Sequence, residues 1–280
     1  NLVSNGDFSQ EGSELITNGD FSVSGTPDAT SWALGWYSNT NNAEIANGKL
    51  TLSNSAAESV SRAYATNGVN SNNILTTNKF YKLQYDIVEN NGATDLKYYS
   101  ANAEFISVPS VDVGSYTLYI QNTGNSLFLF QLNTSNASIS LDNVSIKEVG
   151  QDWTLNGEAE LTAQGARVYS STGSYSSVRQ SSDVLTIGNK YKITFNVIST
   201  NGTSLANGNS NITYDTSTTG NKTFYITASE VGLIFKRAAA ITTDVTITNI
   251  SVIEITDDTN LPRIDYSPYS GAGTCGHWLF

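Results

Sequence analysis

The chain has 280 residues, of which only 14% are charged, against about 25% in a typical soluble domain. Its formal net charge is -11, so it lacks the dense basic surface that nucleic acid or an anionic membrane requires. No apolar run approaches the roughly 20 residues of a membrane span, so membrane insertion is not expected. The single cysteine, Cys275, excludes an intrachain disulfide, and with the single histidine, His277, it excludes a zinc site of four such ligands.

In chain order, short runs rich in Val, Ile, Thr, Tyr and Phe alternate with polar residues, which is typical of strands. The clearest predicted strands are 80–88, 116–121, 126–132, 139–149, 191–198, 223–227, 231–236 and 245–255. Asn-Gly pairs such as Asn91-Gly92 and Asn201-Gly202 separate such runs and predict hairpin turns, because both residues tolerate positive φ. Since no amphipathic helix is evident, the sequence predicts an all-β protein.

An internal repeat indicates two tandem domains of one fold. KFYKLQYDIVENNG, which ends at Gly92, resembles NKYKITFNVISTNG, which ends at Gly202. The strand 139–149 resembles 245–255, and the regions around Trp36 and Trp153 also correspond. Equivalent places in a repeat favour a core role for these two tryptophans.

A shorter duplication lies at the front of the chain, where NLVSNGDF (1–8) and LITNGDF (15–21) are nearly the same segment. The second copy is the natural first strand of the first domain. We expect the first copy to pair elsewhere, either with another subunit or with the second domain, which lacks an NGDF of its own.

NGDF, then Gly-Trp at 35–36, then the closing strand LDNVSI (141–146), resemble the jelly-roll carbohydrate-binding-module superfamily. The resemblance covers 15–150 well and 151–256 more weakly. With the repeat, it implies two antiparallel jelly-roll β-sandwiches (15–150 and 151–256). The duplicated front segment predicts an N-terminal extension with an extra strand (1–14), and the turn signals and prolines of the last segment predict an extended C-terminal connector (257–280). This connector ends on an apolar Trp-Leu-Phe, so we expect either that this end docks on a surface or that the parent chain continues.

The same resemblance implies two kinds of site. The first is a structural calcium between the first and last strands, with Asn18, Asp20 and Asp142 as candidate ligands. Ser22 replaces the expected glutamate, and the alternative is a turn with capped backbone groups. The second is sugar binding by aromatic stacking. Its candidates are Trp32, Tyr37, Tyr98, Tyr99 and Tyr175.

The segment NLPRIDYSPYSGAGTCGHWLF resembles one found in tail-fibre and other appendage proteins of tailed bacteriophages. The matching residues are Pro262, Arg263, Asp265, Tyr266, Gly271, Gly273 and Leu279. This resemblance implies a non-enzymatic tail-fibre, head-fibre or decoration protein on the virion surface, outside the cell. The implied partners are copies of itself, as a homo-oligomer such as a trimer, other virion proteins and cell-surface polysaccharide.

Two alternatives stay open at this point. One is a secreted bacterial pair of carbohydrate-binding modules from a glycan-degrading enzyme, and the other is a cell-surface adhesin or filament subunit. Catalysis is not expected, because nothing fixes a separation among the carboxylates of Asp86, Glu89 and Asp95. Cys275 and His277 are near neighbours in a Gly-rich segment, which rarely preorganises a thiol and its base.

Overall fold

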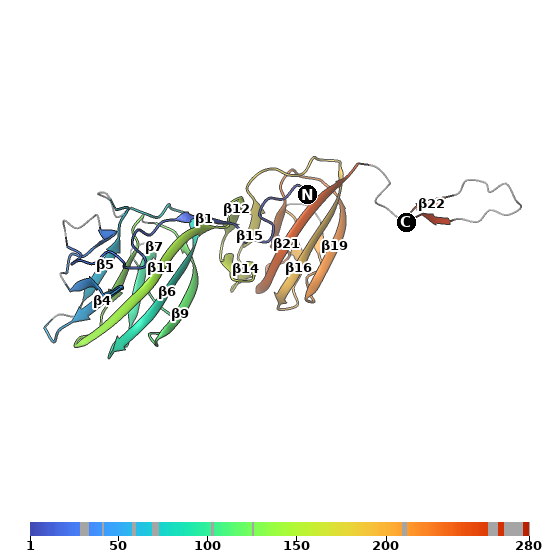
Figure 1. Cartoon of the computed structure of the whole chain (residues 1–280). Coiled ribbons are helices and arrows are strands. Elements are labelled where there is room, and N and C mark those ends of the chain that lie inside the picture. The colour runs from blue at the N-terminus through green and yellow to red at the C-terminus, as the bar shows by residue number, and fades with distance from the viewer. Residues whose placement is uncertain are drawn as a thin grey trace, which may run out of the picture. The chain divides into compact units, whose positions relative to one another are not determined.

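The computed structural model describes residues 1–28, 34–40, 42–57, 60–68, 73–101, 104–124, 126–208, 212–256, 263–265 and 277–279. Apart from Leu34, which lies in a 3-10 turn, the regular elements of these residues are β-strands (Figure 1). The all-β prediction is confirmed. The part of the chain that is described includes no helix long and apolar enough to cross a membrane.

The chain forms two compact units that interleave in sequence. The first sandwich, as we call it, comprises Ser9–Gln151 together with Leu161–Ala163. The second sandwich comprises Asn1–Phe8, Asp152–Glu160 and Gln164–Phe280. The range 1–14, expected to act as one extension, is therefore divided between the two units. Of the two places considered for the first NGDF copy, the structure shows the second domain.

The first sandwich consists of two sheets. One has the order β3-β4-β11-β6-β9, with β1 also paired to β11, and the other has the order β2-β5-β10-β7-β8. The strands of the first sheet are β1 (Glu11–Glu14), β3 (Ala43–Ala46), β4 (Lys49–Asn54), β6 (Lys79–Asn91), β9 (Gly114–Asn122) and β11 (Ala137–Val149). The strands of the second sheet are β2 (Trp36–Tyr37), β5 (Ser61–Ala65), β7 (Leu96–Ala101), β8 (Glu104–Ser107) and β10 (Leu129–Leu132).

The second sandwich repeats this plan with the orders β13-β14-β21-β16-β19 and β12-β15-β20-β17-β18. The strands of its first sheet are β13 (Glu160–Thr162), β14 (Gly165–Ser170), β16 (Lys190–Thr200), β19 (Gly220–Thr227) and β21 (Thr243–Ile255). β13 pairs in this sheet although its last two residues are grouped with the other compact unit. The strands of its second sheet are β12 (Trp153–Asn156), β15 (Ser177–Gln180), β17 (Leu205–Ala206), β18 (Thr213–Tyr214) and β20 (Ile234–Arg237). In the C-terminal segment, β22 (Arg263–Asp265) pairs with β23 (His277–Leu279).

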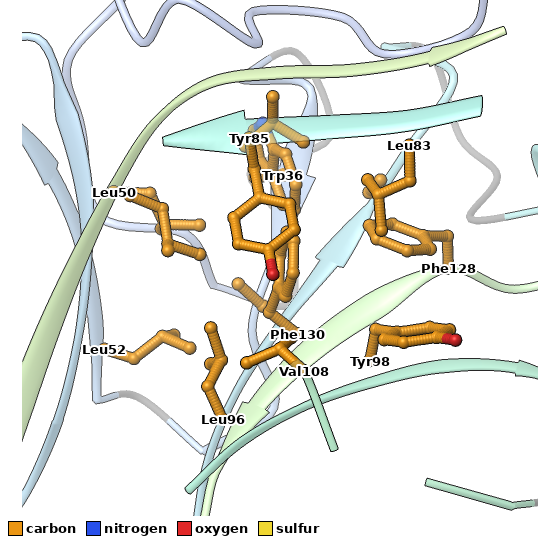
Figure 2. Packing of buried hydrophobic residues seen from close by; sticks show 14 of the residues in the cluster. Trp36, Leu50, Leu52, Leu83, Tyr85, Leu96, Tyr98, Val108, Phe128 and Phe130 are labelled. Atoms are coloured by element: carbon orange, nitrogen blue, oxygen red, sulfur yellow. The ribbon is translucent and has the colours of Figure 1, made fainter. Parts of the chain in front are cut away.

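Strand numbers in the two sandwiches differ by ten at every position of both sheets, so the repeat read from the sequence is a repeat of topology. The prediction of two tandem antiparallel jelly-roll sandwiches is confirmed. Alternation explains why these segments are strands: in β16, Tyr191, Ile193, Phe195 and Val197 are buried, whereas the residues between them are half-buried. Figure 2 shows the matching core of the first sandwich around Trp36, Tyr85 and Phe130.

The last strand of each first sheet carries a β-bulge at an asparagine. The register of β11 against β6 slips between Asp142 and Ser145, and Asn143 has φ 50°. In β21 the slip lies between Thr248 and Ser251, and Asn249 has φ 54°. A bulge takes an N–H out of the ladder, and a buried N–H without an acceptor is costly.

The NGDF turns supply those acceptors. Val144 N–H donates to the carbonyl of Gly19 over 2.8 Å, and Ile250 N–H donates to the carbonyl of Gly6 over 2.9 Å. The approach requires glycine, because a Cβ on Gly19 would lie 1.9 Å from the Val144 oxygen. A Cβ on Gly6 would lie 2.1 Å from the Ile250 oxygen. In Figure 1 the N-terminus accordingly lies beside β21.

A tryptophan holds each turn in place. Trp36 Nε1 donates to the Asn18 carbonyl over 3.2 Å and its ring packs on Phe21, with centroids 5.5 Å apart. Trp153 Nε1 donates to the Asn5 carbonyl over 2.9 Å and packs on Phe8 at 5.0 Å. Trp36 is fully buried and Trp153 is 6% exposed, so the interpretation of both as core residues is confirmed.

A buried tyrosine fixes the chain that enters each central strand. Tyr81 Oη accepts the Thr76 N–H over 2.7 Å, and Tyr191 Oη accepts the Thr186 N–H over 2.8 Å. Burial raises the pKa of Tyr81. In both sandwiches the tyrosine hydroxyl acts as an acceptor for a backbone N–H at the entry to the central strand.

We predict that Tyr81→Phe and Tyr191→Phe each lower the free energy of unfolding by about 1–3 kcal/mol, because each leaves a backbone N–H without its acceptor. Denaturant unfolding measures the change. The control is Tyr225→Phe, whose side chain is 56% exposed and which should shift stability by less than about 0.5 kcal/mol. Equal effects at all three positions would contradict the role assigned to the two buried hydroxyls.

Candidate functional site

The sequence-predicted aromatic residues of the first sandwich separate onto two faces of one sheet. Tyr37 and Tyr99 lie on the face of β2-β5-β10-β7-β8 that points away from the core. Tyr98 lies among the core residues in Figure 2, is 8% exposed, and its pKa is raised by burial. This position does not favour Tyr98 as a binding residue, because its ring packs inside the sandwich. Trp32 lies outside the described residues.

The outward residues form a continuous row across all five strands of this sheet. The row arises because Trp36, Ala63, Phe130 and Tyr98 point into the core, so their strand neighbours point outward. Cross-strand partners in the row are Tyr37 with Tyr64, Tyr64 with Leu129, Leu129 with Tyr99, and Tyr99 with Phe105. We call these five residues the aromatic row.

Ring contacts hold the two ends of the aromatic row. The rings of Tyr37 and Tyr64 tilt against each other at 43° with centroids 5.3 Å apart. The rings of Tyr99 and Phe105 tilt at 51° with centroids 5.1 Å apart. Tyr37, Tyr64 and Phe105 are half-buried, whereas Leu129 is 2% and Tyr99 9% exposed. The ends of the row therefore reach solvent, and its middle is covered.

A polar row lies next to the aromatic one and runs through Arg62, Gln131, Lys97 and Ser107. Arg62 Nε donates to Gln131 Oε1 over 2.5 Å, and Gln131 Nε2 donates to Asn133 Oδ1 over 2.6 Å. At the start of β7, Lys97 pairs with Asp95, two residues before it in the chain, at 3.3 Å. Fixed donors and acceptors beside aromatic rings are the combination that orients a polar ligand on an apolar surface.

Arg62 and Phe105 explain why the middle of the face is covered. They lie on β5 and β8, which are separated by β10 and β7, and flat neighbouring strands are about 4.8 Å apart. Nevertheless the Arg62 guanidinium carbon lies 5.4 Å from the Phe105 ring centroid. The two side chains therefore meet over the middle strands, and this cation–π contact closes the face over Tyr99.

The corresponding face of the second sandwich has a different chemistry. Its equivalent cross-strand partners are Thr154 with Arg179 and Arg179 with Ile234. Thr154 stands where the first sandwich has Tyr37, and Arg179 stands in the place of Tyr64. Within the described residues, an aromatic row is therefore a feature of the first sandwich. Tyr175, the candidate predicted for the second sandwich, is 51% exposed and precedes β15.

The calcium candidates lie near a shallow pocket of about 460 Å³ beside the NGDF turn of the first sandwich. Asn18 and Asp20 line the pocket, but Asp142 is not among its lining residues. Asn18 Oδ1 accepts the Val23 N–H over 3.0 Å, and Asp20 Oδ1 accepts the Ser22 hydroxyl over 3.0 Å. Asp142 Oδ1 accepts the Asn143 N–H over 2.7 Å. These oxygens thus cap nearby donors.

Glu14, which also lines the pocket, is a residue that the sequence reasoning missed. Its Oε1 accepts the N–H groups of Ile16 and Ile146, both over 2.9 Å, and so ties the NGDF segment to β11. In the second sandwich Asn1 does the same: its Oδ1 accepts the N–H groups of Val3 and Val252 over 3.1 and 3.0 Å. Had the second copy been taken to begin at Glu14 instead of Leu15, the alignment of the two copies would have paired Glu14 with Asn1.

The acidic residues considered for catalysis are each held by a separate partner. Asp86 Oδ2 accepts from Asn143 Nδ2 over 2.8 Å, Glu89 pairs with Lys49 at 2.5 Å, and Asp95 pairs with Lys97. The Lys49 ammonium lowers the pKa of Glu89. Among the described residues, no group of three or more His, Cys, Asp or Glu side chains could hold a metal ion. Cys275 lies outside the described residues.

Comparison with known proteins leaves this site without an assigned ligand. No protein-family model matches the chain, and no curated protein matches it. Among solved structures, it is similar to the N-terminal CBM22-1–CBM22-2 tandem domain of Paenibacillus barcinonensis Xyn10C. The identity is 11% and the TM-score 0.35, over 88% of this chain and 99% of the other. These values are too low to transfer a ligand, so the function rests on the side chains described above.

We predict that removing calcium with a chelator leaves the melting temperature of the protein unchanged. The reason is that Asn18 and Glu14 already use their oxygens to bind backbone N–H groups, which an ion would have to displace. Differential scanning calorimetry with and without excess calcium measures this. A rise in melting temperature with calcium that disappears in Asp20→Asn would instead support the ion site.

Proposed function

We propose that this chain is a non-catalytic binding protein that holds saccharides on the aromatic row of its first sandwich. The observation that carries the proposal is the cross-strand row itself, which places Tyr37, Tyr64 and Phe105 at accessible positions on one face. Sugar rings have apolar faces that stack on aromatic rings and hydroxyls that need hydrogen-bond partners. The neighbouring Arg62 and Lys97, which are half-buried, supply such partners, and the buried Gln131 orients Arg62.

The half-buried Tyr37–Tyr64 pair is the accessible end of this site, and the Arg62–Phe105 contact limits access to its middle. A saccharide that occupied more than the end would displace Arg62 from the Phe105 ring. The second sandwich has Thr154 and Arg179 at the equivalent positions, so in this proposal it does not bind the saccharide.

The proposal extends to the place of the protein. On the resemblance of its C-terminal segment to phage appendage proteins, we propose that it is a virion surface component, extracellular and self-associating, and that its saccharide is a cell-surface polysaccharide. Mass spectrometry of density-purified virus particles tests this placement: stoichiometric peptides of the chain support it. Peptides found only in the particle-free secreted fraction would favour the alternative of a secreted binding-module pair.

We predict that Tyr64→Ala lowers the affinity for a bound polysaccharide about two- to tenfold, and that Tyr37→Ala has a similar effect. An aromatic contact contributes about 0.5–1.5 kcal/mol, and 1.4 kcal/mol corresponds to a factor of ten. Affinity electrophoresis of the whole chain against a panel of soluble neutral and acidic polysaccharides, followed by calorimetry on the best ligand, measures the change.

Tyr225→Ala is the matched control, because this tyrosine is 56% exposed and lies on β19 of the second sandwich. Its affinity should equal that of the wild type. If Tyr37→Ala and Tyr64→Ala fold normally and bind as tightly as the wild type, the saccharide is not held by the aromatic row. Loss of binding in Tyr175→Ala alone would move the site to the second sandwich.

A further inference from the structure

The segment Asn1–Phe8 completes a sandwich with which it is not contiguous in sequence. The whole of Ser9–Gln151, which belongs to the first sandwich, lies between this segment and the rest of the second sandwich. Only Ser9 and Gln10 join the segment to β1, which pairs with β11 of the first sandwich. The contact of the segment with the second sandwich therefore resembles the docking of a short peptide on a site formed by residues far away in the sequence.

The site holds the segment along its length by interactions of several kinds. Leu2 N–H donates to the Val252 carbonyl over 2.8 Å. Ile250 N–H donates to Gly6, Val252 N–H to Asn1 Oδ1, and Trp153 Nε1 to Asn5. Val3 and Phe8 are each 8% exposed, so they are the apolar anchors. In the second sandwich, the residues that make these contacts belong to β21 and Trp153. We call this surface of β21 and Trp153, on which the segment lies, the peptide site.

The first sandwich shows what the peptide site selects. There the segment Glu14–Phe21 makes the same set of contacts with β11 and Trp36: Leu15 N–H donates to Ile146, and Val144 N–H donates to Gly19. The shared pattern is a polar acceptor, then Leu, then Val or Ile, then Asn-Gly-Asp-Phe three residues after the Leu. Glu14–Phe21 is contiguous with its sandwich in sequence, whereas Asn1–Phe8 is not, yet both make the same contacts. We infer that the residues of the shared pattern, and not the way the segment is connected, determine the binding.

We propose that the peptide site of the second sandwich also accepts the Asn1–Phe8 segment of a second copy of this chain, and so links copies by segment exchange. Every contact of the closed chain is preserved in the exchanged pair, so the balance depends on effective concentration. For a short connection that concentration is of about millimolar order, which a crowded assembly of copies can match. This proposal is independent of saccharide binding.

The first experiment uses the full chain with Gly6→Ala and a synthetic peptide, NLVSNGDF. The new Cβ would lie 2.1 Å from the Ile250 oxygen, so it displaces the chain's own segment and opens the peptide site. We expect a lower melting temperature for the variant, which the peptide raises back toward the wild-type value. The matched peptide NLVSNADF should have no effect. A destabilised, folded variant that NLVSNGDF does not rescue would overturn the proposal, as would an unaltered melting temperature.

If Gly6→Ala does not fold, Phe8→Ala takes its place. This variant keeps the turn but removes the ring that packs on Trp153, so the peptide should compete with the weakened segment and raise the melting temperature. If the peptide does not stabilise a folded Phe8→Ala chain, the peptide site does not bind an NLVSNGDF segment from another molecule, and the proposal is wrong.

The second experiment tests the second copy directly. Wild-type chains carrying two different labels are mixed at millimolar concentration in mild denaturant, returned to buffer and separated by gel filtration. We expect dimers or larger species that contain both labels, and none from Gly6→Ala chains treated alike. Monomers alone, or mixed species that form equally from Gly6→Ala, would contradict exchange through the peptide site.

Discussion

The structure depends on one local constraint, the satisfaction of a bulge N–H in the last strand of each sandwich. The bulges at Asn143 and Asn249 free the N–H groups of Val144 and Ile250 from the sheet ladder. Leaving such a group buried and unpaired costs about 1–3 kcal/mol. A glycine carbonyl from an NGDF turn pairs with each of them, and only glycine can come so close.

This constraint accounts for the order of the chain. The second sandwich has a bulge that needs an acceptor but no NGDF sequence after residue 151. It obtains one from Asn1–Phe8, so the first sandwich is inserted between the first segment of the second sandwich and its remainder. Trp36 and Trp153 then cover the turns and bond to their asparagine carbonyls. The two tryptophans at equivalent positions of the repeat thus hold the NGDF turns by a hydrogen bond and a ring contact.

Much of the fold could be predicted from the sequence because the repeat preserved buried positions. Tyr81 and Tyr191, which occupy equivalent positions in the repeat, both accept a backbone N–H at the entry to a central strand. The candidate site was harder, because adjacent residues of a strand face opposite ways. Tyr98 and Tyr99 are the same residue type side by side, yet the first lies in the core and the second in the aromatic row. Strand register decides between them, and register is set by long-range pairing that one sequence does not reveal.

The division of labour between the sandwiches follows from the same framework. The shared plan of sheets and NGDF turns fixes position, while the outward residues differ: tyrosines in the first sandwich, Thr154 and Arg179 in the second. In our two proposals, the outward face of the first sandwich holds the saccharide and the peptide site of the second sandwich links copies of the chain.

The most direct test of the central claim is the hydrogen exchange of backbone amides in the intact chain, measured by NMR. We predict that the N–H groups of Ile250 and Val252 exchange as slowly as those of Val144 and Ile146, because the Asn1–Phe8 segment supplies their acceptors. Fast exchange at Ile250 and Val252, with the neighbouring ladder of β21 still protected, would show that the segment is not docked, and would contradict the account.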